Sequence, residues 1–241
     1  MMQARLALAA VLGLSLTLAS ACGGNSSARD GASTPGAASS SAPAAPAASV
    51  RADAAVDTRP RVVFLGDSLT AGLGLDQDEA YPALVQRKID ADGLHYHVVN
   101  AGVSGDTSAG GLSRLDWALE GDVKVMVVAL GGNDGLRGLP ADELKKNLST
   151  IIVRAQAKKV KVILAGMEAP PNFGQSYIVS FRQVYPDLAR QYGIPLVPFL
   201  LQGVAGIEGL NQRDGIHPTA EGARTVADNV WTTLRPTLKG T

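Results

Sequence analysis

The chain has 241 residues, of which 46% are hydrophobic and 18% are charged, and this composition is typical of a globular protein. Lysine plus arginine and aspartate plus glutamate both number 22, so the formal net charge is +0. No excess of positive charge is available to attract phosphate backbones, which argues against nucleic acid as a partner.

The amino terminus has the pattern of an export signal. Arg5 precedes residues 6–19, which carry no charge and are too few to span a bilayer but suit the apolar region of a signal peptide. Small residues then lead to Cys22, the only cysteine, so no internal disulfide can form. The pattern resembles a bacterial lipobox and predicts a signal over residues 1–21 and lipidation of Cys22. The alternative is ordinary signal cleavage near Ala21, with Cys22 incidental.

Residues 22–58 are dominated by Ala, Ser, Gly and Pro and contain very few bulky apolar side chains. Such a segment cannot bury enough apolar surface to offset the entropy of ordering, so we expect a disordered tether. Behind a lipid anchor, this tether would hold a folded domain, residues 59–241, away from a membrane. We therefore predict a protein anchored in a bacterial cell envelope, with its domain facing the periplasm.

Beyond residue 59, short apolar runs alternate with segments of helical periodicity. The predicted strands are residues 61–65, 95–100, 124–130, 161–167 and 194–199. The predicted helices are residues 80–93, 107–121, 141–159, 176–193 and 218–234, the last opened by Pro218. This alternation indicates a five-stranded parallel sheet covered on both faces, which is a three-layer α/β/α sandwich.

Polar clusters occur where three of these strands end and where the last helix begins. Residues 66–68 (Gly-Asp-Ser) follow the first strand, residues 100–107 the second and residues 131–134 (Gly-Gly-Asn-Asp) the third, while residues 214–218 (Asp-Gly-Ile-His-Pro) precede the final helix. Open α/β folds bind ligands at the carboxyl edge of the sheet, so we expect the four clusters to lie together there. Each cluster alone is also compatible with an ordinary polar turn.

The residue types in these clusters suit acyl transfer. Ser68 can supply a nucleophile, His217 a base, and Asp214 a carboxylate that orients the imidazole. The Ser68 N–H, the Gly105 N–H and the Asn133 amide can donate hydrogen bonds to an oxyanion. In the alternative interpretation, Asp214 caps the last helix and His217 is merely solvated.

Other side chains remain open to two interpretations. His95 and His97 project from one strand face, but no third ligand accompanies them, so we predict no metal site. Residues 135–140 are a short loop with a glycine near each end, and we expect this loop to move over a bound acyl chain. Several loop hydrophobics either line an acyl groove or anchor their loops: Leu73, Leu75, Leu136, Leu139, Met167 and Phe173.

Together the clusters resemble the sequence blocks of the SGNH, or GDSL, hydrolases. The resemblance covers most of residues 61–235 and rests on FLGDSLTAGLGL, NAGVSGDTSAGGLSRL, ALGGNDGLRG and DGIHPTAEG. These segments are most similar to the bacterial thioesterase, lysophospholipase and arylesterase branch. The resemblance implies a flavodoxin-like sheet and an esterase without metal or cofactor. It also implies that Ser68 is the nucleophile, His217 the base and Asp214 its orienter, with Ser68, Gly105 and Asn133 as oxyanion donors.

The sequence thus predicts a serine esterase that hydrolyses carboxylic esters or thioesters through an acyl-Ser68 intermediate. Small arylesters, acyl thioesters and lysophospholipids are the expected substrates, and Cys22 the expected link to a membrane. One alternative is a deacetylase or acyltransferase acting on envelope polysaccharide. A second is a non-catalytic binding lipoprotein, although a binder has no need of Ser68, Asn133, Asp214 and His217 together.

Overall fold

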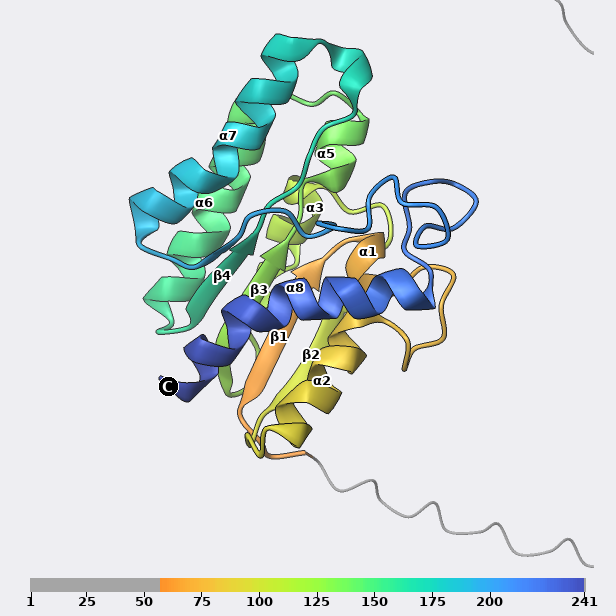
Figure 1. The fold of residues 1–241 in the computed structure, drawn as a ribbon. Helices are drawn as coiled ribbons and strands as arrows, with labels where there is room; N and C mark the ends of the chain where they lie inside the picture. Colours follow the sequence, from red (N-terminus) through yellow and green to blue (C-terminus); the bar gives the residue numbers. More distant parts are fainter. Residues whose placement is uncertain (1–56, 241) are drawn as a thin grey trace, which may run out of the picture. The chain divides into compact units, whose positions relative to one another are not determined.

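The computed structural model describes residues 57–240 (Figure 1). The predicted export signal, Cys22 and nearly all of the predicted tether lie outside the described residues. None of the helices formed by residues 57–240 has the length and apolar character needed to cross a membrane.

The sheet is parallel and five-stranded, as predicted, with the order β2-β1-β3-β4-β5. Its strands are β1 (Arg61–Gly66), β2 (His97–Gly102), β3 (Val123–Ala129), β4 (Lys161–Ala165) and β5 (Leu196–Val197). This order is that of flavodoxin-like folds, in which the ligand crevice opens where the chain direction switches between β1 and β3. The predicted fold class is therefore confirmed.

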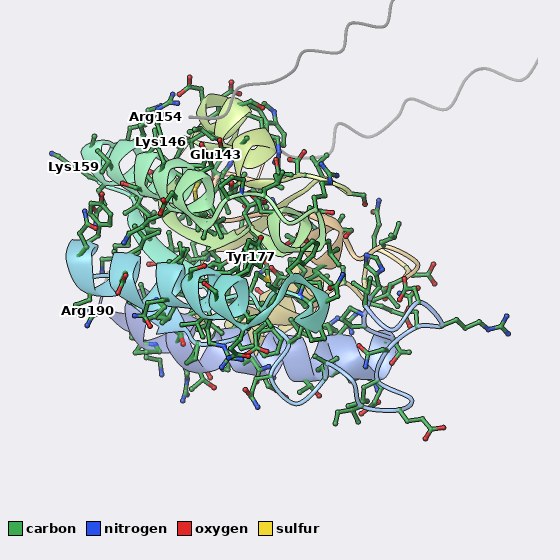
Figure 2. All side chains as sticks on the ribbon, turned by 90° about the horizontal axis from the view of Figure 1, so that it is seen from above. Glu143, Lys146, Arg154, Lys159, Tyr177 and Arg190 are labelled. Carbon is green, nitrogen blue, oxygen red and sulfur yellow. The ribbon has the colours of Figure 1, made fainter. Side chains whose placement is uncertain are left out.

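Helices cover both faces of the sheet. On one face, α8 (Ala220–Lys239) packs against α2 (Tyr81–Ala91), and Figure 1 shows the two on the same side. On the other face, α6 (Ala141–Ala157) packs against α3 (Ser108–Ser113) and α7 (Gln175–Tyr192). In Figure 2 the labelled charged side chains of α6 and α7 lie toward the border of the molecule, whereas Tyr177 lies nearer its middle.

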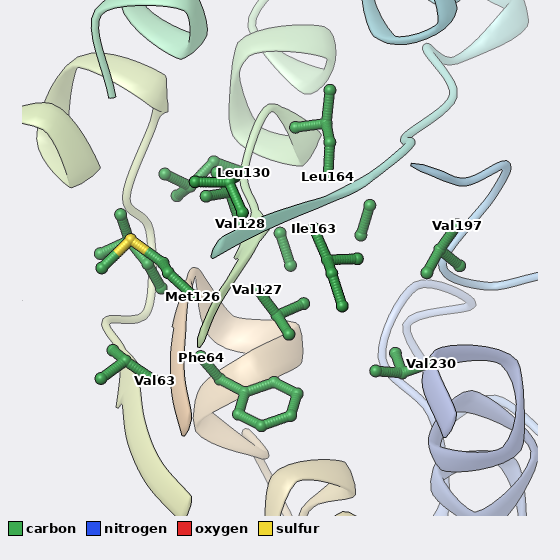
Figure 3. Close-up of a cluster of buried hydrophobic side chains, with 14 of the residues drawn as sticks. Val63, Phe64, Met126, Val127, Val128, Leu130, Ile163, Leu164, Val197 and Val230 are labelled. Atoms are coloured by element: carbon green, nitrogen blue, oxygen red, sulfur yellow. The ribbon is translucent and has the colours of Figure 1, made fainter. Parts of the chain in front are cut away.

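The central strands carry the hydrophobic core. Because successive strand residues point to opposite faces, Val63 and Met126 lie on one side and Phe64 on the other (Figure 3). All three are at most 1% exposed, and each such buried side chain contributes about 1.5–3 kcal/mol to folding. This two-sided burial gives the site loops a rigid base at the ends of β1 and β3.

Three predicted elements differ from the structure, each for a local reason. Strand β5 has two residues instead of six because Pro195 and Pro198 flank it and cannot donate to a strand ladder. The predicted helix 107–121 is divided into α3 and α4 (Leu115–Ala118) at Arg114, which leaves helical geometry. Helix α8 begins after Thr219, whose side chain accepts from Gly222 N–H, so Pro218 precedes the helix rather than opening it.

Periodicity did not reveal three short helical segments. They are α1 (Ser68–Ala71), α5 (Gly132–Leu136) and the 3₁₀ turn η1 (Pro171–Phe173). None is long enough to show a repeating apolar face. Both α1 and α5 begin in the polar clusters that follow β1 and β3, so the two strand ends that flank the crevice each lead directly into a helical turn.

Candidate active site

Ser68, His217 and Asp214 form a continuous hydrogen-bonded series at the carboxyl edge of the sheet. The Ser68 Oγ lies 2.8 Å from His217 Nε2, and His217 Nδ1 lies 2.6 Å from Asp214 Oδ2. The Ser68 and His217 side chains are 149 positions apart in sequence. The fold therefore brings together the three residues that the sequence predicted as a triad.

The junction between β1 and α1 fixes the position of Ser68. Asp67 caps α1 by accepting a hydrogen bond from Leu69 N–H at 3.0 Å, and α1 ends at Gly72, whose φ of 78° favours glycine. Gly66 must also be glycine, because a Cβ there would lie 1.9 Å from the Thr70 Oγ1. Ser68 is thus the first residue of a tightly constrained helical turn.

Asp67 is almost completely buried beneath Ser68, with 1% of its surface exposed. Its Oδ2 lies 3.4 Å from the Asn133 Nδ2, so one carboxylate joins the end of β1 to α5. Burial raises the pKa of Asp67 to about 6, while the hydrogen bond from Leu69 and the nearby His217 act in the opposite direction. Asp67 therefore joins β1, α1 and α5, but ionising its buried carboxyl group costs electrostatic free energy.

A tight turn holds His217 and Asp214 together. Asp214 Oδ1 accepts hydrogen bonds from the N–H groups of Ile216 at 2.9 Å and His217 at 3.0 Å, which leaves Oδ2 for the imidazole. These bonds, that of Ile216 first, lower the pKa of Asp214 to about 2. A carboxylate that stays ionised can fix the His217 tautomer and stabilise an imidazolium.

Gln212 links the His217 loop to the Ser68 side of the site. Its Nε2 donates to the carbonyl oxygens of Leu73 at 2.7 Å and Pro218 at 2.9 Å, and its backbone N–H donates to His217 O at 2.7 Å. Gln212 was not predicted from the sequence, because glutamine in a loop carries no motif and its partners are backbone atoms.

The predicted oxyanion donors also lie at this edge. Asn133 Nδ2 donates to Asp106 O at 2.9 Å as well as to Asp67, so α5 contacts both the Ser68 turn and the loop after β2. Gly105 lies in that loop with a φ of 85° and is exposed, and its N–H has no acceptor among residues 57–240. The Gly105 N–H is thus available to a ligand. The Asn133 amide must give up one of its two present hydrogen bonds before it can donate to a ligand.

A second residue that sequence reasoning missed, Arg114, ties these loops to the sheet. Its guanidinium pairs with Asp106 Oδ2 at 2.6 Å and donates to the carbonyl oxygens of Ala101 and Gly66, each at 2.7 Å. Since Gly66 and Ala101 lie at or near the ends of neighbouring strands, Arg114 fixes the Gly105 loop relative to Ser68. The side chains of Arg114 and Asp106 are 17% and 19% exposed, so solvent screens this pair only partly.

Buried polar contacts fix α5 from its other side. Asp134 is 2% exposed and accepts hydrogen bonds from both the N–H and the Oγ of Ser108, at 2.8 and 2.5 Å. Asn147 donates to the same Ser108 Oγ at 3.0 Å, and Tyr177 donates to Leu139 O at 2.8 Å. Asn133 therefore projects from a helix that is anchored by α3, α6 and α7.

The predicted groove hydrophobics divide into three groups. Leu73 and Leu75 line a cavity of about 10 Å³ beside Ser68 and His217, room for about one water molecule. Leu136 and Phe173 are exposed, and Leu139 is half-buried. Met167 is 3% exposed within the core, which makes it a packing residue. The cavity beside Ser68 and His217 is therefore small and partly apolar.

Among residues 57–240, no three histidine, cysteine or acidic side chains are grouped as metal ligands. His97 Nδ1 lies 3.0 Å from Asp57 Oδ2, at the opposite end of β2 from the site. His95 is exposed in the segment that precedes β2, so the predicted placement of His95 and His97 on one strand face is wrong.

A serine, a histidine and an aspartate in consecutive contact on a flavodoxin-like sheet define the arrangement of a serine hydrolase. Residues 64–225 match the sequence model of the GDSL-like Lipase/Acylhydrolase family, and the chain belongs to that family. Esterase TesA of Pseudomonas aeruginosa is 46% identical over 178 residues, which are 73% of this chain and 89% of that protein.

Two further comparisons agree with this assignment. Thioesterase 1/protease 1/lysophospholipase L1 of Escherichia coli K12 is 37% identical over 184 residues, which are 76% of this chain and 86% of that protein. The crystal structure of TesA superposes with a TM-score of 0.71 at 46% identity, over 73% of this chain and 98% of TesA. Both the sequence family and the fold are therefore those that the four polar clusters predicted.

Proposed function

We propose that this protein hydrolyses carboxylic esters or thioesters through an acyl intermediate on Ser68. The observation that carries the proposal is the unbroken hydrogen-bonded series from Asp214 through His217 to Ser68. Family membership and relatives named esterase, thioesterase and arylesterase support the same reaction class.

The geometry supports the following sequence of steps. His217 Nε2 accepts the Ser68 proton as Oγ attacks the acyl carbon, and the imidazolium then protonates the leaving oxygen or sulfur. The Ser68 and Gly105 N–H groups and the Asn133 amide stabilise the oxyanion, Asn133 exchanging its long hydrogen bond to Asp67 for one to the substrate. Water, activated by the same imidazole, releases the acid and restores Ser68.

The apolar surroundings favour acyl chains over sugars as the group bound next to Ser68. Leu73 and Leu75 line the small cavity beside Ser68, and Leu136 is 45% exposed one turn beyond Asn133. An acyl chain of a thioester, arylester or lysophospholipid can cover such side chains and gain about 25 cal/mol per Å² of apolar surface removed from water. The rival substrate, an acetylated envelope polysaccharide, offers much less apolar surface.

The proposal includes an envelope location, which rests on the sequence pattern around Cys22. Export, diacylation of the Cys22 thiol and a flexible tether would place the hydrolase close to lipid substrates while leaving it in water. Incorporation of labelled palmitate in bacterial cells, lost in Cys22→Ala, is the expected result. Export without label incorporation would instead indicate ordinary signal cleavage.

The decisive test is Ser68→Ala, assayed with p-nitrophenyl esters from acetyl to palmitoyl. Removing a nucleophile that acts within a triad is expected to lower kcat by about 10⁴–10⁶. Ser180→Ala, which removes an exposed hydroxyl on α7, serves as the matched control and should leave kcat unchanged. Activity that persists in Ser68→Ala would contradict the proposal, and an acetyl-only preference would favour the deacetylase.

A further inference from the structure

The arginines of the described chain differ in how their charge is compensated. Residues 57–240 contain eleven arginines, and eight of these pair with a carboxylate: Arg59, Arg87, Arg114, Arg154, Arg182, Arg190, Arg224 and Arg235. Arg61, Arg137 and Arg213 have no carboxylate partner in this part of the chain. Of these three, Arg137 and Arg213 lie in the loops that carry the candidate site.

Arg137 is positioned by the same short helix as Asn133. The two residues are four apart and therefore lie on one face of α5, and the Arg137 N–H donates to Asn133 O at 3.1 Å. Asn133 Nδ2 donates to Asp106 O and Arg137 Nη2 donates to Gly105 O at 2.9 Å, so the two side chains bind consecutive carbonyls. The guanidinium thus lies against Gly105, beside the candidate oxyanion donors.

The space around this guanidinium is open. Gly105 and Arg137 are both exposed, and a Cβ placed on Gly105 would have only the Arg137 Nη2 within 4 Å, at 3.9 Å. The nearby carboxylates are engaged elsewhere, Asp106 with Arg114 and Asp134 with Ser108. Arg137 has one protein acceptor for its five N–H donors, and their planar arrangement matches the oxygens of a carboxylate or phosphate.

We propose that Arg137 forms an anion subsite beside Gly105, which makes the enzyme favour esters that carry a phosphate or carboxylate a few bonds from the ester carbonyl. The proposal rests on the proposed hydrolase function, because it assigns a substrate preference to the same site. The anionic group belongs either to the leaving group, as a phosphate on glycerol, or to the acyl side, as the free carboxylate of a diacid monoester.

The test compares matched substrates that differ in one charge. Octanoyl glycerol phosphate against monooctanoylglycerol, both below their micelle concentrations, examines the leaving group. The p-nitrophenyl monoester of glutaric acid against p-nitrophenyl pentanoate examines the acyl side. The measured quantity is the ratio of kcat/KM for the anionic and neutral member of each pair, in the full-length protein and in Arg137→Gln.

In Arg137→Gln we expect the ratio to fall about five- to tenfold for one pair, and that pair identifies the source of the anion. The wild-type ratio should decrease with added salt, because the charges meet at an exposed site. Arg137→Lys keeps the charge without the planar donors and should lose only part of the preference. The neutral esters should be hydrolysed at similar rates by all three proteins.

Arg213→Gln is the matched control, since Arg213 is also unpaired and lies next to Asp214 on the opposite side of the site. An equal fall in the ratio for Arg213→Gln would show general attraction and overturn the subsite. So would an unchanged ratio in Arg137→Gln, or an equal loss on neutral esters, which would make Arg137 a residue that only positions Gly105. If the wild type hydrolyses none of the four substrates, it is the proposed function that fails.

Discussion

The two sides of the candidate site are built in opposite ways. Ser68 lies at the junction of β1 and α1, with the buried strands of the sheet beneath it. His217 lies in a long loop between β5 and α8, and the one strand-like contact of this loop among residues 57–240 is the isolated bridge between Asn211 and Pro218. The Ser68 side is thus an extension of the sheet. The His217 loop is anchored in the core at its beginning, where Leu200 and Val204 are 0% exposed, but its His217 end is exposed and held mainly by hydrogen bonds.

The aspartates of the two sides show the same contrast electrostatically. Asp67 is 1% exposed, and burial raises its pKa to about 6. The side chain of Asp214 is 44% exposed, and hydrogen bonds from the Ile216 N–H and the His217 ring lower its pKa to about 2. The buried carboxylate is costly to ionise and serves to join loops, whereas the exposed one is ionised and serves to orient the imidazole.

Among variants that alter one side of the site, Asp214→Asn on the His217 side should cause the largest fall in kcat. Asp214 Oδ1 accepts two backbone N–H groups, so in the asparagine the NH2 group takes the place of Oδ2 and donates to His217 Nδ1 instead of accepting from it. The imidazole is then held in the wrong tautomer, and the imidazolium loses its negative partner. We expect kcat for a p-nitrophenyl ester to fall by about 10³–10⁴, with little change in the urea midpoint because the side chain is exposed. A loss below tenfold would show that the Asp214 turn, rather than its charge, holds His217.

Arg114→Met should instead destabilise the Ser68 side of the site. The change leaves Asp106 without its cation and removes donors from the Gly66 and Ala101 carbonyls, in a pair that is less than one-fifth exposed. We expect the free energy of unfolding to fall by about 3 kcal/mol in urea titrations. Arg154→Met, which removes an exposed pair with Asp116, is the control and should cost at most about 1 kcal/mol.

Asp67→Asn tests the cost of the buried carboxylate through pH. In the wild type, the folded state keeps its proton up to about pH 6 and the unfolded state releases it near 3.8, so this contribution to stability is present at low pH and lost as pH rises between these values. The loss is about 3 kcal/mol. In Asp67→Asn, the free energy of unfolding should therefore change less between about pH 4 and pH 7.

Asp214→Asn provides the opposite control in the same titrations. Because the pKa of Asp214 is lowered to about 2, its contribution is present above pH 3.8 and is lost as pH falls toward 2. Any difference from the wild type should be small, since solvent screens an exposed group, and confined to the acid end. Identical pH dependence of wild type and Asp67→Asn would show that folding does not raise the pKa of Asp67.

The sequence predicts the strands, the long helices and the polar clusters of the site, but not the side chains that join them. Strands β1 to β4 and the long helices are visible as apolar runs and periodic faces, and Ser68, Gly105, Asn133, Asp214 and His217 stand in recognisable clusters. Arg114 and Gln212 were missed because their acceptors are mainly backbone carbonyls remote in sequence; Gln212 and Leu73 are 139 positions apart. Such contacts place no constraint on the chemistry of the partner side chain, so no pairing of side-chain types in the sequence points to them.

Gln212 joins the two sides of the site, so replacing it tests whether each side depends on the other. Gln212→Met keeps the length of the side chain but removes the hydrogen bonds to Leu73 O and Pro218 O. We expect a loss of about 1–2 kcal/mol in unfolding free energy and roughly a tenfold fall in kcat, because His217 is then held less firmly over Ser68. Gln202→Met, an exposed glutamine in the same loop, is the control for a methionine at the surface. If both variants retain full activity, the Asp214 turn alone positions His217, and the two sides of the site are mechanically independent.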